Sequence, residues 1–209
     1  MLFRSPGNSH FPDFTNPKTR QWWGSKFEFY TNIGIDGFWN DMNEPSVWGQ
    51  SLPDMLEFDF DGHRTTTKEA RNVYGMQMAR ATYEGAREQL KGKRPLNITR
   101  ATYSGGQRYS TIWTGDNCAS DEHMLLSARL VNSLGLCGFP FAGPDIGGFV
   151  GIPSRELMTR WLSLAVFTPF MRNHADESNL SREPWVFGLE WEKIQRELIE
   201  ERYRLLPYI

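Results

Sequence analysis

The sequence predicts an α/β fold in which helices cover both faces of a parallel sheet. Short apolar segments alternate along the chain with longer amphipathic ones, the pattern of buried strands joined by helices. Polar residues mark the strand ends: Asp41, Arg100, Asp116, Asp145 and His174 each stand at or just after the end of a different strand. That edge carries the ligand site in a (β/α)8 barrel and in a doubly wound sheet alike. Periodicity alone leaves these two architectures open.

The first half of the chain is predicted to begin with a long helix. Asn16 is a good capping residue, and a proline follows at the first helical position. Trp23, Phe27 and Tyr30 are spaced i, i+4, i+7 and form an apolar stripe, and Gly34 ends the helix. The elements expected next are a strand over 35–39, a loop over 46–64, a helix over 67–90 and a strand over 95–99.

The second half continues the alternation and brings the total to about five buried strands. Fifteen residues, many of them Gly and Ser, separate Arg100 from Asp116, which barely allows a helical crossover, so a bent loop is expected there. Phe27, Tyr30, Trp161 and Phe167 are expected in the core, and Cys118 and Cys137 are expected as buried thiols. The elements expected are strands over 109–114, 137–142 and 168–171, and helices over 120–134, 153–167 and 190–206.

Length and composition restrict the class of protein. The 209 residues suffice for one domain with a large core but fall short of a complete eight-fold barrel. A net charge of −2 argues against nucleic acid and membrane partners, and no apolar run approaches the roughly 20 residues of a membrane span. The first ten residues lack a signal peptide's apolar region. We expect the true N-terminus to be missing and leave localisation open, with the cytoplasm favoured.

Paired carboxyl groups point to glycoside hydrolysis. Hydrolysis with retention needs two of them about 5–5.5 Å apart, one ionised to attack carbon and one carrying a proton. Asp41 and Asp116 are the best pair, because both end strands and both sit near tryptophans, Trp39 and Trp113. Arg100 would favour the charged form of the nucleophile. With 25 acidic residues in the chain, spacing alone makes a weak case.

Three motifs carry a family resemblance. Residues 37–44 (GFWNDMNE) resemble the nucleophile signature of glycoside hydrolase family 31, and residues 100–116 (RATYSGGQRYSTIWTGD) resemble its acid/base segment. Residues 143–149 (GPDIGGF) resemble its second signature, which continues at 157, 160–161, 169–170 and 172–173. The match covers most of the chain in the family's order.

The resemblance implies a fold and an activity. The fold is a partial (β/α)8 TIM barrel, with residues 1–209 holding about strands four to eight and with the family's N- and C-terminal β-sandwich domains absent. The activity is that of a retaining α-glucosidase, which removes terminal α-linked glucose from oligosaccharides or glycans through a covalent glycosyl-enzyme intermediate. The tryptophan two residues before the nucleophile and the methionine directly after it resemble the α-glucosidase branch, not the α-xylosidase branch.

The resemblance also implies roles. Asp41 is the nucleophile and Asp116 the general acid/base. The positions that match the family's glucose-binding subsite are Trp39, Met42, Arg100, Trp113, Asp145, Phe149 and His174. The partner is an α-glucoside oligosaccharide; neither cofactor nor metal is required, and the oligomeric state is open.

Several alternatives stand beside these assignments. Glu44 is expected to make supporting hydrogen bonds, not to act directly. Asp59, Asp61 and His63 look like a metal cluster but are better explained as a solvated loop, because the twelfth-position Glu of an EF-hand is missing. The chain could instead be a non-catalytic fragment with open sheet edges, or a sugar-binding relic. Among enzymes, the rival is an α-transglucosidase with the same residues.

Overall fold

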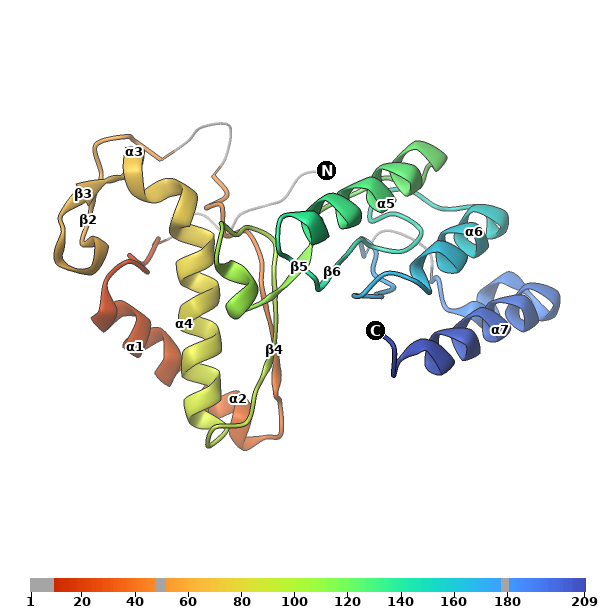
Figure 1. Cartoon of the computed structure of the whole chain (residues 1–209), viewed down its shortest axis with the longest axis horizontal. Coiled ribbons are helices and arrows are strands. Elements are labelled where there is room, and N and C mark those ends of the chain that lie inside the picture. The colour runs from red at the N-terminus through yellow and green to blue at the C-terminus, as the bar shows by residue number, and fades with distance from the viewer. Residues whose placement is uncertain (1–9, 48–51, 178–180) are drawn as a thin grey trace. The chain divides into compact units, whose positions relative to one another are not determined.

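The computed structural model describes residues 10–47, 52–177 and 181–209 of the chain. These residues fall into two compact units, Met1–Thr111 (unit 1) and Ile112–Ile209 (unit 2), whose elements are labelled in Figure 1. Each unit contains one pair of parallel strands together with several helices. No helix in the described ranges is long and apolar enough to cross a membrane.

Unit 1 is built around the parallel pair β1 and β4. Residues Gly37 to Asn40 of β1 lie opposite Leu96 to Thr99 of β4, so the two strands end at the same edge. In chain order the elements are α1 (Pro17–Ser25), α2 (Glu28–Asn32), β1 (Gly37–Asn40), β2 (Glu57–Phe58), η1 (Phe60–Gly62), β3 (Thr65–Thr66), α3 (Thr67–Ala70), η2 (Arg71–Val73), α4 (Tyr74–Gln89), β4 (Leu96–Thr99) and η3 (Gly106–Arg108).

Unit 2 is built around the parallel pair β5 and β6, in which Trp113 lies opposite Gly143. Strand β5 starts at Thr111, the last residue of unit 1. The elements are β5 (Thr111–Trp113), α5 (Asp121–Leu136), β6 (Ala142–Gly143), α6 (Arg155–Ala165), η4 (Pro184–Phe187) and α7 (Leu189–Leu205).

The helix starts predicted at Asn16 and Ser120 are confirmed, whereas the single helix expected over 67–90 is divided into α3, the 3-10 turn η2 and α4. The first helix is also shorter than expected. The Asn16 side chain accepts the N–H of Lys18 at 2.8 Å, with Pro17 in the first turn. The helix then stops at Ser25, and a separate five-residue helix, α2, follows. The break turns Tyr30 outward, so its assignment to the core is wrong, whereas that of Phe27 is confirmed.

Two of the expected strands do not form as predicted. Over 168–171 the structure has no strand, because Pro169 cannot donate to a ladder and the Thr168 hydroxyl bonds to nearby backbone carbonyls instead. Only isolated bonds remain along this segment, such as Phe170 N to Ala142 O at 3.2 Å. Of the strand expected over 137–142, only Ala142 is in a strand, β6, which continues to Gly143. The earlier residues are not extended as a strand because Gly138 has a φ of 87° and Pro140 follows shortly after it.

Three smaller expectations also change. The long loop contains a short antiparallel pair, β2 with β3, that extends two residues beyond its predicted end. Both cysteines are exposed, so the prediction of buried thiols is wrong. Phe167 is 69% exposed just past the end of α6, so it is not core, whereas Trp161 is fully buried. The bent loop expected after Arg100 does lack a crossover helix and contains only the 3-10 turn η3.

Close helix packing and a buried polar chain hold unit 1 together. Helices α1 and α4 lie side by side (Figure 1), and a Cβ on Gly85 would lie 2.1 Å from the Cα of Gly24. From α1, the Trp23 indole donates to the Thr82 hydroxyl, which donates to Asn40 Oδ1. Asn40 in turn donates to Asn97 on β4. Because Thr82, Asn40 and Asn97 are buried and bonded to one another and to the half-buried Trp23, they fix the strands against the helices.

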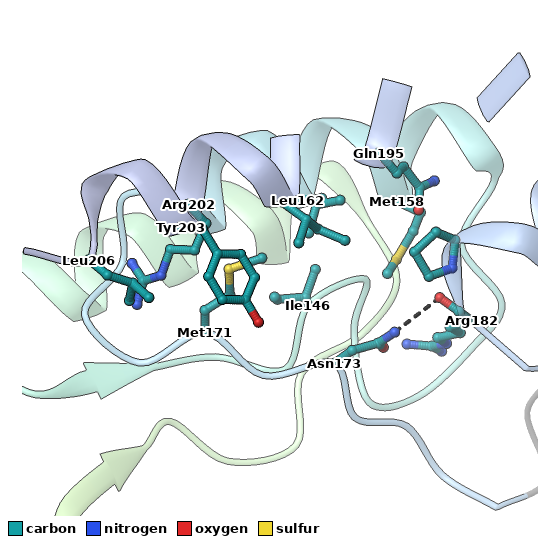
Figure 2. Close-up of a pocket in the computed structure, with 12 residues that line it drawn as sticks. Ile146, Met158, Leu162, Met171, Asn173, Arg182, Gln195, Arg202, Tyr203 and Leu206 are labelled. Atoms are coloured by element: carbon teal, nitrogen blue, oxygen red, sulfur yellow. Dashed lines mark hydrogen bonds between the residues drawn. The ribbon is translucent and has the colours of Figure 1, made fainter. Parts of the chain in front are cut away.

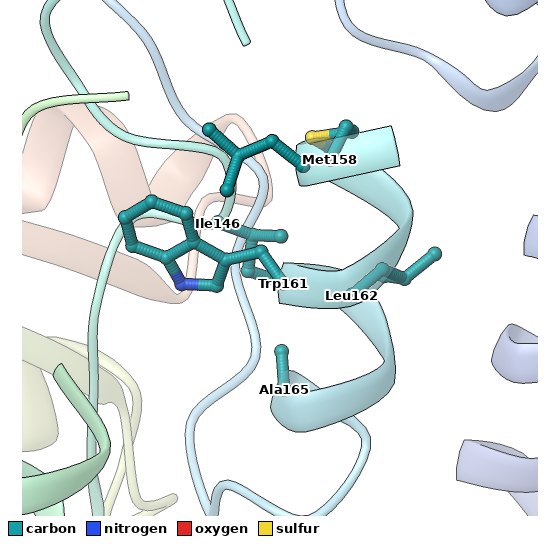
Figure 3. Close-up of a cluster of buried hydrophobic side chains, with 6 residues drawn as sticks. Ile146, Met158, Trp161, Leu162 and Ala165 are labelled. Atoms are coloured by element: carbon teal, nitrogen blue, oxygen red, sulfur yellow. The ribbon is translucent and has the colours of Figure 1, made fainter. Parts of the chain in front are cut away.

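The core of unit 2 is the inner stripe of α6. Leu157, Met158, Trp161, Leu162 and Ala165 recur at helical spacing and are all buried. Figure 3 shows Met158, Trp161, Leu162 and Ala165 projecting from the helix, with Ile146, from the loop that precedes α6, beside Trp161. Since Ile146 directly follows Asp145, this core fixes the segment that carries Asp145.

Candidate active site

The parallel register of unit 1 places the nucleophile candidate beside its cation. Asn40 and Thr99 are partners at the ends of β1 and β4, and the next residues are Asp41 and Arg100. The Arg100 backbone N–H donates to the Asn40 carbonyl at 3.1 Å, which continues the ladder by one step. Both side chains therefore leave the sheet at its carboxyl edge, where the sequence analysis expects the site.

Arg100 binds two carboxylates at once. Its Nη1 lies 3.0 Å from Asp41 Oδ1, while its Nε and Nη2 donate to the two oxygens of Glu44 at 2.8 and 2.9 Å. Nη2 also lies 3.0 Å from the Met42 sulfur. A planar guanidinium is suited to such a fork, because its five donors have a fixed geometry. Glu44 thus makes the supporting hydrogen bonds predicted for it and orients Arg100 toward Asp41.

The segment after Asp41 is tightly held. Met42 adopts a left-handed φ of 57°, uncommon for a residue with a side chain, and its N–H donates to Asp41 Oδ1 at 2.8 Å. Asn43 is buried, donates to the Thr99 hydroxyl at 2.9 Å and accepts the Ala101 N–H at 3.0 Å. Trp39, two residues before Asp41, exposes 41% of its surface and so offers an apolar ring face.

Unit 2 carries the acid/base candidate on a short polar turn after β5. Trp113 ends the strand and is buried, and Asp116 follows three residues later with an exposed side chain. Gly115 between them has φ 87°, a conformation in which glycine is favoured. The turn thus carries the chain from the buried tryptophan to an exposed carboxyl group.

Asp145 is a buried carboxyl group with a shifted pKa. It is completely buried, and its Oδ1 accepts a hydrogen bond from Arg172 Nη2 at 2.8 Å. Burial raises the pKa of Asp145 to about 6, and the charge of Asp116 adds to the increase, whereas Arg172 opposes it. The Arg172 guanidinium also lies 5.1 Å from the centre of the Trp113 ring.

Aromatic side chains pack against His174 beside the Asp145–Arg172 ion pair. The Phe149 ring stacks on His174 with centroids 5.4 Å apart and an interplanar angle of 19°. Trp113 meets the same histidine edge-on at 6.3 Å. The unit 2 residues predicted for the sugar site therefore gather in one cluster, which also contains Arg172.

Arg172 and Asn43 both lie within the sequence motifs, but the motifs alone predict no role for either residue. Both stand within two residues of a predicted site residue and carry side chains that bond to several groups at once. That proximity is the signal by which they could have been found.

The predicted site residues thus form two groups, one in each unit. Unit 1 holds Asp41 with its cation and the two neighbouring apolar side chains, Trp39 and Met42. Unit 2 holds the other five: Trp113, Asp116, Asp145, Phe149 and His174.

A cavity of about 440 Å³ in unit 2 is separate from these residues. It lies between α6 and α7, and Figure 2 shows Ile146, Met171 and Asn173 among the side chains that line it. Those three alternate along the chain with Asp145, Arg172 and His174, none of which lines the cavity. The cavity therefore lies behind the backbone of the candidate site.

The possible metal cluster in the long loop is not formed. Asp59 accepts the Gly62 N–H within its own turn, and Asp61 pairs with Arg20 at 2.7 Å. Among the residues that the structure describes, no three His, Cys, Asp or Glu side chains are grouped to hold a metal ion.

Comparison with known proteins identifies the family. The profile of the glycosyl hydrolases family 31 TIM-barrel domain matches residues 2–209. The chain belongs to glycosyl hydrolases family 31. This confirms both the resemblance carried by the three motifs and the partial TIM barrel as the fold class.

Individual family 31 members resemble the chain closely. It is 48% identical over 206 residues to alpha-glucosidase 2 of Bacillus thermoamyloliquefaciens, covering 98% of this chain and 26% of that protein. The crystal structure of a glucosidase II alpha subunit, described as alpha3-Glc2-bound, matches with a TM-score of 0.83 at 36% identity, over 93% of this chain and 22% of that one.

A Flavobacterium johnsoniae family 31 dextranase complexed with glucose also gives a TM-score of 0.83, at 34% identity, over 94% of this chain and 25% of that one. The chain thus spans about a quarter of the length of these relatives.

Proposed function

We propose that this chain supplies the nucleophile and the acid/base of a retaining α-glucosidase. The observation that carries the proposal is the ion pair between Arg100 and Asp41 at the carboxyl edge of two adjacent parallel strands. A carboxylate paired with a fixed guanidinium points in one direction, as a nucleophile must. Family membership and the names of relatives such as alpha-glucosidase 2 support the same reading.

The proposed reaction has two displacements. In the first, Asp116 gives its proton to the glycosidic oxygen while an Asp41 oxygen attacks the anomeric carbon, so the bond to the leaving sugar breaks and a glucosyl ester forms. In the second, Asp116 removes a proton from water, whose oxygen attacks the same carbon and releases Asp41. Two inversions leave glucose in its α configuration.

The remaining predicted residues would bind the terminal glucose. Arg100 and His174 offer charged or polar groups for sugar hydroxyls, and Asp145 is proposed to do so from its buried position beside Arg172. The ring faces of Trp39 and others would offer apolar contact to the C–H faces of the sugar. The substrate class proposed is an oligosaccharide or glycan with a terminal α-linked glucose. The whole of residues 1–209 is proposed as part of the catalytic barrel.

Substitution of the two aspartates in the natural full-length protein tests the proposal. Asp41→Ala should abolish turnover of maltose and of p-nitrophenyl α-glucoside, and a fluorosugar that traps the glucosyl ester should add mass to the peptide containing Asp41. Asp36→Ala is the matched control, because Asp36 is an exposed aspartate at the opposite end of β1. Hydrolysis by Asp41→Ala at the wild-type rate would refute the assignment.

The stereochemistry of the product provides a second, independent check. NMR of the first-formed sugar should show α-glucose, and β-glucose would contradict a double displacement. Comparing free glucose with newly made oligosaccharides would separate hydrolysis from transfer to a sugar acceptor.

A further inference from the structure

The residue directly after the proposed acid/base joins two segments of the candidate site. Asn117 is only 8% exposed, and its Nδ2 donates to the Asp145 carbonyl at 3.0 Å. Its Oδ1 accepts the Phe149 N–H at 2.7 Å. Its own carbonyl accepts the Val150 N–H at 2.9 Å. Every one of these bonds reaches the segment 145–150, so one side chain and one peptide group tie that segment to residue 117.

The segment 145–150 needs such a tie because its backbone cannot form a regular ladder. Gly147 and Gly148 have φ values of 84° and 88°, which turn the chain away from an extended path. Gly148 also lies against the backbone of Cys118 and Ala119, where a Cβ would come within 2.6 Å of three atoms. The Asn117 amide therefore satisfies buried backbone groups that strand pairing would satisfy elsewhere.

The held segment carries two of the residues proposed to bind glucose. Asp145 is at its start, paired with Arg172, and Phe149 is near its end, stacked on His174. Asp116 directly precedes Asn117 in the chain, so it is attached to the residue that makes these bonds. The position of Asp116 relative to Asp145 and Phe149 thus depends on this buried amide, together with the Ala119 N–H, which donates to the Val150 carbonyl at 2.8 Å, and Arg182, which donates to the Gly148 carbonyl.

We propose that Asn117 is a positioning residue for the general acid/base, holding Asp116 at a fixed offset from Asp145 and Phe149. The inference rests on the proposed function, because it takes Asp116 as the proton donor. Asn117 touches neither the substrate nor the reacting atoms in this role. Its loss should let the turn at 115–117 move against the segment 145–150 and so misplace the Asp116 proton.

The leaving group distinguishes this role from a general loss of structure. Protonation by Asp116 is needed most when the leaving group is a sugar alkoxide and least when it is p-nitrophenolate, which leaves without a proton. Asn117→Ala removes two hydrogen bonds to buried groups, so kcat/KM for maltose should fall about 10- to 100-fold. The kcat/KM for p-nitrophenyl α-glucoside should fall less than about threefold, because its first step needs little acid catalysis.

The second step supplies another readout. A misplaced base deprotonates water poorly, so kcat on the aryl glucoside should fall while KM falls with it as the glucosyl ester accumulates. Azide needs no deprotonation and should restore kcat. Asn117→Ser, whose hydroxyl can keep one of the two contacts, should lie between the wild type and Asn117→Ala on both readouts.

The experiment uses the natural full-length protein, with Asn132→Ala on the exposed surface of α5 as the control and thermal melting for every variant. Equal losses on maltose and the aryl glucoside, with or without a lower melting temperature, would overturn the positioning role. If Asn117→Ala does not fold, the same comparison is made on Asn117→Ser.

Asp116→Ala separates the two hypotheses. If Asp116→Ala shows the leaving-group dependence and the Asn117 variants do not, the inference fails and the proposed function stands. If Asp116→Ala shows none, the proposed acid/base itself is wrong and the inference falls with it.

Discussion

Replacement of Arg100 by lysine tests how much of the proposed nucleophile's orientation comes from a single guanidinium. Arg100 makes three contacts to carboxylate oxygens, one to Asp41 and two to Glu44. An ammonium group at this position is a compact point charge without the planar fork, so it cannot keep all three contacts in the same geometry. Arg100→Lys therefore keeps the charge but loses about two of the three contacts.

The expected magnitude follows from exposure. The Arg100 side chain is 15% exposed, whereas those of Asp41 and Glu44 are 31% and 45% exposed. A hydrogen bond between charged groups contributes about 1.5–3 kcal/mol when it is shielded, and about 1 kcal/mol or less at an exposed site. At about 1 kcal/mol for each of two lost contacts, the total is about 2 kcal/mol, or roughly a 30-fold loss in kcat/KM.

The assay is the steady-state hydrolysis of p-nitrophenyl α-glucoside by the natural full-length protein. Arg108→Lys is the matched control, because Arg108 is exposed and its Nε donates to one backbone carbonyl in the same unit. Glu44→Gln and the double variant complete a cycle, in which the two losses should combine to less than their sum. A kcat/KM for Arg100→Lys within threefold of wild type, in a variant that melts normally, would refute this reasoning.

Three further outcomes are expected. Gly85→Ala should lower the free energy of unfolding by about 1–3 kcal/mol in urea titrations, because its Cβ would meet the Gly24 backbone, whereas Gly135→Ala, with open space around it, should not destabilise. Because the pKa of Asp145 is raised to about 6 in the folded chain, between about pH 4 and 6 the folded chain keeps a proton that the unfolded chain has released. The free energy of unfolding of the wild type should therefore fall as the pH rises through this range. Relative to Asp145→Asn, the fall should be up to about 1.4 kcal/mol per pH unit. Ser154→Ala, which removes the cap bonded to Leu157 N at 3.1 Å, should lower the melting temperature, equivalent to about 1 kcal/mol, and unchanged melting would contradict that role.

Local signals were enough to locate most of the elements. Asn16 and Ser120 stand at two predicted helix starts, and both side chains do cap the helices that follow. Such caps depend on atoms two or three residues away, so a sequence contains all the information needed for them. The strands β1 and β4 were also placed to within two residues, because short apolar runs bounded by polar residues leave little choice.

Signals that depend on distant neighbours were less reliable. The segment 168–171 is apolar enough for a strand, yet a ladder needs donors, and Pro169 has none to offer. Tyr30 continues the apolar spacing of the first helix, but the break at Ser25 takes it out of the core. Hydrophobicity identifies residues that could be buried, whereas burial itself depends on which surfaces cover them.

By itself, the sequence determined the family, the order of most of the strands and helices, and the residue types at the strand ends. It did so because motifs, caps and apolar runs are contiguous in the chain. Only the tertiary structure decided that Arg100 holds Asp41 and Glu44 together, that burial raises the pKa of Asp145 to about 6, and that Asn117 bonds to the segment beginning there. These properties arise between groups up to 59 residues apart, whose separation and solvent exposure are set by strand register and packing.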